Sequence, residues 1–154
     1  MTRSVSILIV GVGNRLREDD AFGPLVAEQL EHRIDDERVE ILERATLTPE
    51  LTENLAQASH VIFLDASAEL APGEFERRPI SRDSRGDLAL VHFLSPEALL
   101  EWTTRLFGKA PSAEIWLMGV AGTGLSEQLT PTVAGRLPEV LELLARRIQE
   151  LLVE

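Results

Sequence analysis

The sequence predicts an α/β fold: a three-layer α/β/α sandwich around a twisted, mostly parallel but mixed sheet of about five strands. Short apolar runs rich in β-branched residues recur along the chain, and stretches with the apolar spacing of a helix separate them. Strands that alternate with helices imply right-handed crossovers and a sheet covered on both faces. The length of 154 residues, of which 44% are hydrophobic, suits a single domain spanning residues 1–154.

Five segments have the apolar pattern of strands: residues 5–10, 39–43, 60–65, 87–93 and 113–120. The first is a β-branched run that ends at Gly11, as expected of a strand buried on both faces. The third and fifth have the same character, and the third ends at Asp65. The second alternates between apolar and polar residues, which places it nearer an edge of the sheet.

Four segments have the apolar spacing of helices: residues 22–30, 51–58, 95–108 and 130–151. Pro49 and Pro96 each follow a hydroxyl residue, which is the arrangement expected at the first turn of a helix. Gly108 is expected to end the third helix. Pro138 either kinks the fourth helix or marks its true start.

The formal net charge of −11 at pH 7 excludes some classes of partner. Such a field repels phosphate backbones and anionic lipid headgroups, so we expect neither nucleic acid nor a membrane surface as a partner. No apolar run has the length of a membrane span or of a signal-peptide core, and the chain is therefore expected to be cytoplasmic. The lack of cysteine excludes thiol chemistry. A local basic stretch with Arg77, Arg78, Arg82 and Arg85 is interpreted as a solvated loop rather than a contact for a substrate tail.

Three side chains of the kinds that bind metals follow the expected strand ends. Ligands of parallel sheets bind beyond the carboxyl ends of the strands. There the sequence places Asp20 after the first strand, Asp65 after the third, and His92 if residues 87–93 form a strand. Two carboxylates and an imidazole suit nickel, zinc or manganese, with open positions left for water or for a partner's ligands. From spacing alone, an acidic helix start, a turn aspartate and a surface or hydrogen-bonded histidine are the more common explanations of the same residues.

The first loop also carries the beginning of a dinucleotide-binding pattern. Gly11 and Gly13 follow a buried strand, but Leu16 occupies the position of the third glycine. The acidic residues 18–20 would face a pyrophosphate, which needs bare backbone amides at a helix start. A nucleotide-binding enzyme is therefore the weakest of the functional interpretations.

The same loop closely resembles a family motif. Residues 11–23 (GVGNRLREDDAFG) are similar to the opening motif of the hydrogenase maturation endopeptidases, which trim the C-terminal tail from the large subunit of nickel–iron hydrogenases. The resemblance continues in order along nearly the whole chain, through residues 47–55, 61–66, 92–97 and 124–131. Two departures are Ala21, where many members have glycine, and residues 44–46, where relatives commonly have a glycine-rich turn.

The resemblance implies an α/β/α sandwich with a metal-contacting trio at Asp20, Asp65 and His92. The implied substrate is a hydrogenase large-subunit precursor whose nickel already sits among its own thiolates. The trio would complete the coordination of that nickel, which would serve for recognition and would place one peptide bond for hydrolysis. Nickel is thus expected as a substrate-bound group that the free protein need not retain.

The resemblance leaves the cleavage chemistry open. Without cysteine or a Ser-His-Asp order, attack by water is favoured, and Ser67 and Ser95 stay as alternative nucleophiles. Either nickel polarises the scissile carbonyl, or Asp20 or Asp65 acts as general base. If both carboxylates bind metal, Asp19 is the next candidate for the base. A non-catalytic, nickel-sensing assembly factor would need the same trio, so the sequence does not separate it from the endopeptidase.

Overall fold

The computed structural model describes residues 5–82 and 94–154. Its strands are β1 (Ile7–Val12), β2 (Val39–Arg44), β3 (His60–Ser67), β4 (Phe75–Ile80) and β5 (Ser112–Gly119). Its helices are η1 (Glu18–Ala21), α1 (Phe22–Glu31), η2 (Pro49–Leu51), α2 (Thr52–Gln57), α3 (Pro96–Phe107), α4 (Pro131–Ala134) and α5 (Leu137–Leu152), where η denotes a short 3-10 helix. No helix in this described part is long and apolar enough to cross a membrane.

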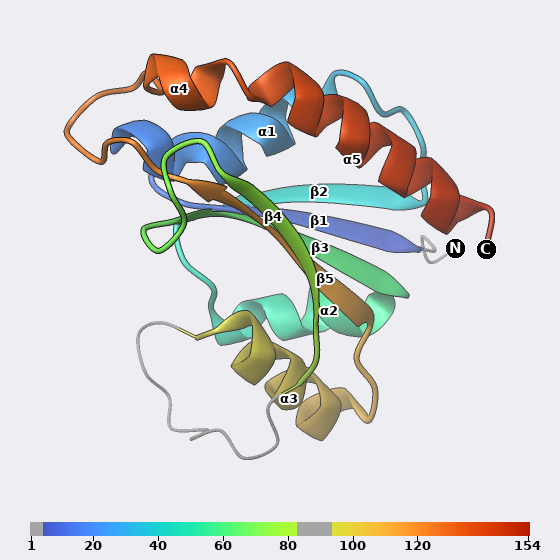
Figure 1. Ribbon diagram of the computed structural model, residues 1–154. Coiled ribbons are helices and arrows are strands. Elements are labelled where there is room, and N and C mark those ends of the chain that lie inside the picture. The colour runs from blue at the N-terminus through green and yellow to red at the C-terminus, as the bar shows by residue number, and fades with distance from the viewer. Residues whose placement is uncertain (1–4, 83–93) are drawn as a thin grey trace.

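The strands form one sheet in the order β2-β1-β3-β5-β4. All neighbours are parallel except β4, which runs antiparallel to β5. Helices α1, α4 and α5 cover one face of the sheet, and α2 and α3 cover the other (Figure 1). The predicted three-layer sandwich with a mixed, mostly parallel sheet is therefore confirmed.

Each face of the sheet has its own apolar core, because successive side chains of a strand point to opposite sides. In β1, Ile7 and Ile9 pack into the core that contains α1 and α5, whereas Leu8 and Val10 pack into the core that contains α3. All four side chains are at most 1% exposed. This burial on both faces explains why the first strand shows an apolar run rather than alternation.

The helix boundaries follow the signals in the sequence. Ser95 caps α3 with a side-chain hydrogen bond from the amide of Ala98, and Gly108 ends it with a φ of 78°. The last predicted helix is divided into α4 and α5, and Pro138 lies in the first turn of α5. Pro138 thus marks a helix start rather than a kink.

The sequence analysis missed β4. This strand carries two adjacent arginines and Pro79, a composition that argues against a central strand. It lies at the edge of the sheet, where a residue without an N–H group is tolerated. The prediction that Arg77 and Arg78 lie in a solvated loop was therefore wrong. The predicted strand at residues 87–93 and Arg85 lie outside the described residues.

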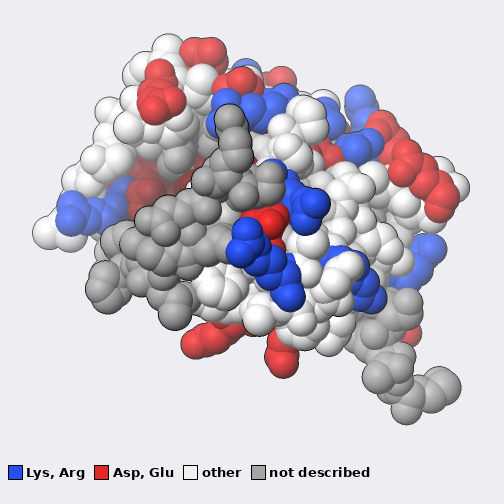
Figure 2. Space-filling view, turned by 90° about the horizontal axis from the view of Figure 1, so that it is seen from below, with Lys and Arg blue, Asp and Glu red and all other residues white. Residues whose placement is uncertain are grey.

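Basic side chains gather around acidic atoms on the face that Figure 2 shows from below, the side of α2 and α3. Glu101 of α3 is buried, and it pairs with Arg82 at 3.5 Å and with Arg105 at 3.2 Å. Part of the predicted basic stretch is therefore engaged by a carboxylate of the protein itself.

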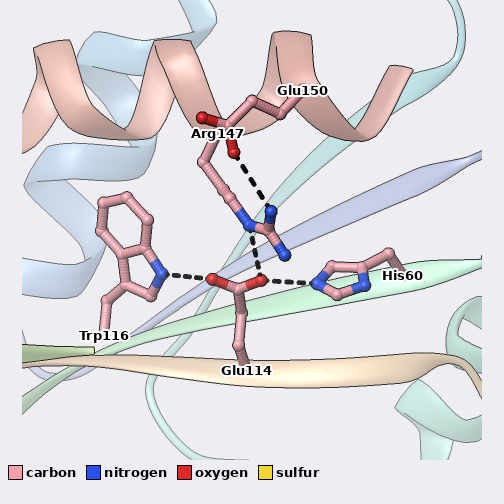
Figure 3. A network of polar contacts seen from close by, with 5 residues as sticks. All are labelled: His60, Glu114, Trp116, Arg147 and Glu150. Atoms are coloured by element: carbon pink, nitrogen blue, oxygen red, sulfur yellow. Dashed lines mark hydrogen bonds and ion pairs between the residues drawn. The ribbon is translucent and has the colours of Figure 1, made fainter. Parts of the chain in front are cut away.

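Glu114 of β5 is a buried carboxylate that joins three elements of the fold (Figure 3). Its Oε1 lies 2.7 Å from His60 Nε2 and accepts from Arg147 Nε at 2.9 Å, while its Oε2 accepts from Trp116 Nε1 at 2.8 Å. Burial by itself would raise the pKa of Glu114, but the hydrogen bonds from His60, Trp116 and Arg147 outweigh burial and lower the pKa to about 2. This network fastens α5 to β3 and β5.

Replacing Glu114 by alanine should lower the free energy of unfolding by about 2–4 kcal/mol at pH 7, because Arg147 and Trp116 lose their buried partner. The folded-state pKa lies below the ordinary value of 4.5, so the carboxylate stabilises the fold above pH 4.5 and this stabilisation is lost as the pH falls toward 2. Urea unfolding of the wild type and of Glu114→Ala at pH 7 and pH 3 checks this. The difference between their free energies of unfolding should be smaller at pH 3. Glu150→Ala removes a carboxylate that is 62% exposed and should cost less than about 0.5 kcal/mol.

Candidate active site

The order of the strands reverses between β1 and β3, because β2 lies on one side of β1 and the later strands lie on the other. The carboxyl ends of β1 and β3 therefore border a crevice of the kind that binds ligands in α/β proteins. Asp20 lies in η1, shortly after β1, and Asp65 lies near the end of β3. The fold thus brings two of the three predicted site residues together. His92, the third, lies outside the described residues.

Asp65 is a largely buried carboxyl whose charge is poorly compensated. Burial raises its pKa to about 7; a hydrogen bond from the amide of Ala66, at 2.8 Å, opposes this, and the negative charge of Asp20 adds to it. The Asp65 side chain therefore exchanges a proton near neutral pH. A cation between Asp20 and Asp65 would favour the ionised form of both.

Replacing Asp65 by asparagine should stabilise the fold at neutral and alkaline pH. A carboxyl whose pKa is raised from 3.8 to about 7 weakens the fold progressively as the pH rises from about 4 to about 7, since the folded state resists losing the proton. Below pH 4 both side chains are neutral, so the two proteins should unfold at similar urea concentrations. At pH 8 the Asn variant should be more stable by roughly 2–4 kcal/mol. A difference of equal size at pH 4 and pH 8 would contradict this origin.

Asp20 is built into the loop that precedes it. The amide of Asn14 donates to Asp20 Oδ2 at 2.8 Å, and Asn14 Oδ1 accepts from the amide of Leu16 at 2.8 Å. Gly13 has a φ of 148°, and a Cβ there would overlap the carbonyl oxygen of Asp20. The glycine and the asparagine therefore shape the turn that presents Asp20 at the crevice.

Asp19 has a different role from its neighbour. Its side chain is fully buried, and its two oxygens accept from the amides of Ala121, Gly122 and Thr130 and from the Thr130 hydroxyl, at 2.8–3.1 Å. These contacts fix the loop between β5 and α4, and they argue against Asp19 as a general base. The sequence alone could not tell the buried, structural carboxylate of Asp19 from the half-buried one of Asp20.

Asp19→Asn should lower the free energy of unfolding by about 2–3 kcal/mol, because an amide nitrogen would replace one acceptor and face buried N–H donors. Amide hydrogen exchange should increase most at residues 121–130, whose amides Asp19 holds. Protection equal to that of the wild type in this loop would show that Asp19 is not its anchor.

The described residues supply only part of a metal site. Within residues 5–82 and 94–154, no group of three or more His, Cys, Asp or Glu side chains is placed to hold a metal ion. Asp20 offers carboxylate oxygens from η1, and Asp65 offers them from near the end of β3. A metal held between them would need further ligands from elsewhere.

Comparison with known proteins identifies the family. No protein-family model matches the chain. The chain is 34% identical to the hydrogenase 2 maturation protease of Escherichia coli in an alignment that covers 96% of this chain and 93% of that protein. The chain belongs to the hydrogenase maturation proteases. It is therefore an enzyme, a hydrolase of the peptidase class.

Solved structures of the family have the same fold as this hydrogenase maturation protease. The hydrogenase maturating endopeptidase HybD from E. coli superposes with a TM-score of 0.75 at 30% identity, covering 95% of this chain and 93% of that one. The [NiFe] hydrogenase maturation protease HycI from Thermococcus kodakarensis gives a TM-score of 0.73 at 27% identity, covering 97% and 94%. The likeness thus extends over nearly the full length of each chain.

Glu18 has a structural role like that of Asp19, and the sequence analysis did not single it out. It has a φ of 47°, and its Oε1 accepts from the amide of Gly124 at 2.7 Å. Together with Asp19, it ties the loop after β1 to the loop after β5. The signal in the sequence was its place beside Asp19 and Asp20, but its partner lies 106 positions away.

A groove of about 290 Å³ adjoins the Asp20 loop of the protease, between residues 13–15 and residues 43–45 at the end of β2. Arg15 lies along it, held by Glu43 through Nε at 2.9 Å and Nη2 at 2.7 Å. The groove therefore lies beside the turn that carries Asp20.

Proposed function

We propose that this protease removes the C-terminal extension of a nickel–iron hydrogenase large-subunit precursor after nickel has been inserted. The observation that carries the proposal is the pair Asp20 and Asp65 at the switch point of the sheet, in a chain whose relatives are named hydrogenase maturation proteases. The proposed site of action is the cytoplasm, and the proposed partner is the precursor alone, without nucleic acid or membrane.

Nickel enters this proposal as part of the substrate. Two carboxylates are too few to hold a metal tightly, but they suit a metal that arrives with thiolate ligands of its own. His92 is proposed as the third protein ligand on the strength of the sequence motif. Only a metal-loaded precursor would then seat its scissile bond at the crevice.

In the proposed reaction, water attacks the scissile carbonyl carbon and the leaving amine receives a proton. The bound nickel can polarise the carbonyl, and this metal-assisted route is the one we favour. Asp65 is the alternative general base, because its pKa of about 7 matches the task better than that of an ordinary aspartate. In both routes Asp65 must be ionised, either to meet nickel or to accept a proton, so kcat/KM should rise with pH through an apparent pKa near 7.

Intact mass spectrometry of a large-subunit precursor, incubated with the protease with and without nickel loading, tests the proposal. Loss of one C-terminal peptide from the loaded precursor alone is the expected result. Nickel-dependent complex formation without cleavage would instead support a non-catalytic assembly factor. If the precursor is neither cleaved nor bound, the endopeptidase and the assembly factor are both refuted. Thermal stabilisation by NAD or NADP would then favour nucleotide binding.

A further inference from the structure

Two exposed leucines lie side by side next to the candidate active site. Leu16, in the loop after β1, is 52% exposed, and Leu125, in the loop after β5, is 85% exposed. The amide of Ser126 donates to the carbonyl of Leu16 at 3.0 Å, and the amide of Glu18 donates to the carbonyl of Ser126 at 3.0 Å. The two loops therefore run parallel at this point, with Arg17 paired to Ser126.

This pairing places the two leucines in register. Leu16 and Leu125 each directly precede one member of the Arg17–Ser126 pair, so the two residues occupy adjacent positions on hydrogen-bonded loops. Both side chains are exposed there. We refer to Leu16 and Leu125 as the apolar rim. Single exposed leucines are ordinary, but two that lie on hydrogen-bonded loops from distant parts of the chain form a small exposed apolar patch.

The apolar rim has a fixed position relative to Asp20. The amide of Leu16 is bonded to Asn14, whose own amide is bonded to the Asp20 carboxylate. On the other side, Glu18 holds the amide of Gly124, directly before Leu125. A chain that contacts the rim is consequently placed at a defined distance from the carboxylates of the crevice.

We propose that the apolar rim docks an apolar segment of the precursor protein beside the peptide bond to be cut. This inference rests on the proposed function. The occupant follows from continuity with the site, because a protease must hold a protein chain across its carboxylates and the rim borders the same edge of the sheet. Leu106 and Phe107, at the end of α3, are also exposed, but they precede β5 and so lie toward the opposite edge.

The test compares cleavage of nickel-loaded precursor by the wild type and by the double variant Leu16→Gln/Leu125→Gln. Loss of both apolar contacts should raise KM about tenfold and leave kcat within about twofold. The double variant Leu16→Met/Leu125→Met, which keeps apolar side chains, should retain the KM of the wild type. Leu106→Gln is the matched control and should change neither constant. The rim side chains are exposed, so urea midpoints should stay unchanged.

The outcomes separate the rim from the proposed function. The docking role of the apolar rim is refuted if KM is unchanged in the Gln double variant, or if KM rises equally in Leu106→Gln. Cleavage by the wild type would still support the proposed function. If the wild type binds the precursor without cutting it, the function fails and the rim is judged by the dissociation constant, which should rise about tenfold in the Gln variant alone. No binding of the precursor by the wild type overturns both.

Discussion

Replacing Asp20 by asparagine should reduce cleavage of the nickel-loaded precursor by at least about a hundredfold while the protein stays folded. The amide side chain keeps an oxygen for the amide of Asn14, so the turn survives, but the charge that would meet nickel or a proton is lost. Asp65→Asn should have the same effect, since its oxygen can still accept from Ala66. His92→Ala is expected to abolish processing as well. Intact mass spectrometry over a time course measures all three.

Glu142→Gln is a suitable control for these variants, because it removes one negative charge from an exposed position on α5. Its cleavage rate should match that of the wild type within about twofold, which would exclude an effect of net charge on association. Full activity of any site variant would remove that residue from the active site. Asp65→Asn is the most informative of them, because it should lose activity and gain stability together.

Gly23→Ala should cost the fold at least about 3–5 kcal/mol or prevent it from forming. A Cβ at this position of α1 would overlap the carbonyl oxygen of Leu64 and come within 2.6 Å of the backbone nitrogen and oxygen of Val12. Both neighbours belong to the central strands β1 and β3, whose backbones are held on both sides by the ladder. The clash therefore has no flexible side chain to absorb it. Soluble yield and the urea midpoint report the effect.

Gly108→Ala is the matched control for this prediction. Gly108 has a positive φ of 78°, but a Cβ there would meet no heavy atom within 4 Å. The variant should lose only about 1 kcal/mol from backbone strain. If Gly23→Ala were no more destabilised than Gly108→Ala, α1 would not pack against β1 and β3 as closely as described.

The parts of the fold that could be predicted from the sequence are those whose signals are local. Strands β1, β3 and β5 are buried on both faces and leave apolar runs, and the ends of α3 are marked by Ser95 and Gly108. Strand β4 was not predicted because an edge strand needs neither an apolar run nor every N–H group. Pro79 and the arginines of β4 are therefore permitted there.

The candidate site divides in the same way. Asp20 and Asp65 could be selected because one follows a recognisable strand and the other lies near the end of one, and strand order then brings the two ends together. The separate roles of Glu18 and Asp19 could not be predicted, because their partners lie more than 100 residues away in the chain. The raised pKa of Asp65 depends on burial by the complete fold, which no short motif encodes.

The hydrogen bonds between Asp19 and Thr130 have a consequence for biosynthesis. The two residues are 111 positions apart, so at 5–20 residues per second roughly 6–20 s pass between their emergence from the ribosome. During that interval Asp19 lacks the amides of residues 121, 122 and 130, and β1 has been made while α4 and α5 have not. The turn that carries Asp19 and Asp20 therefore gains its hydrogen bonds to the loop after β5 only once residues 121–130 have been made.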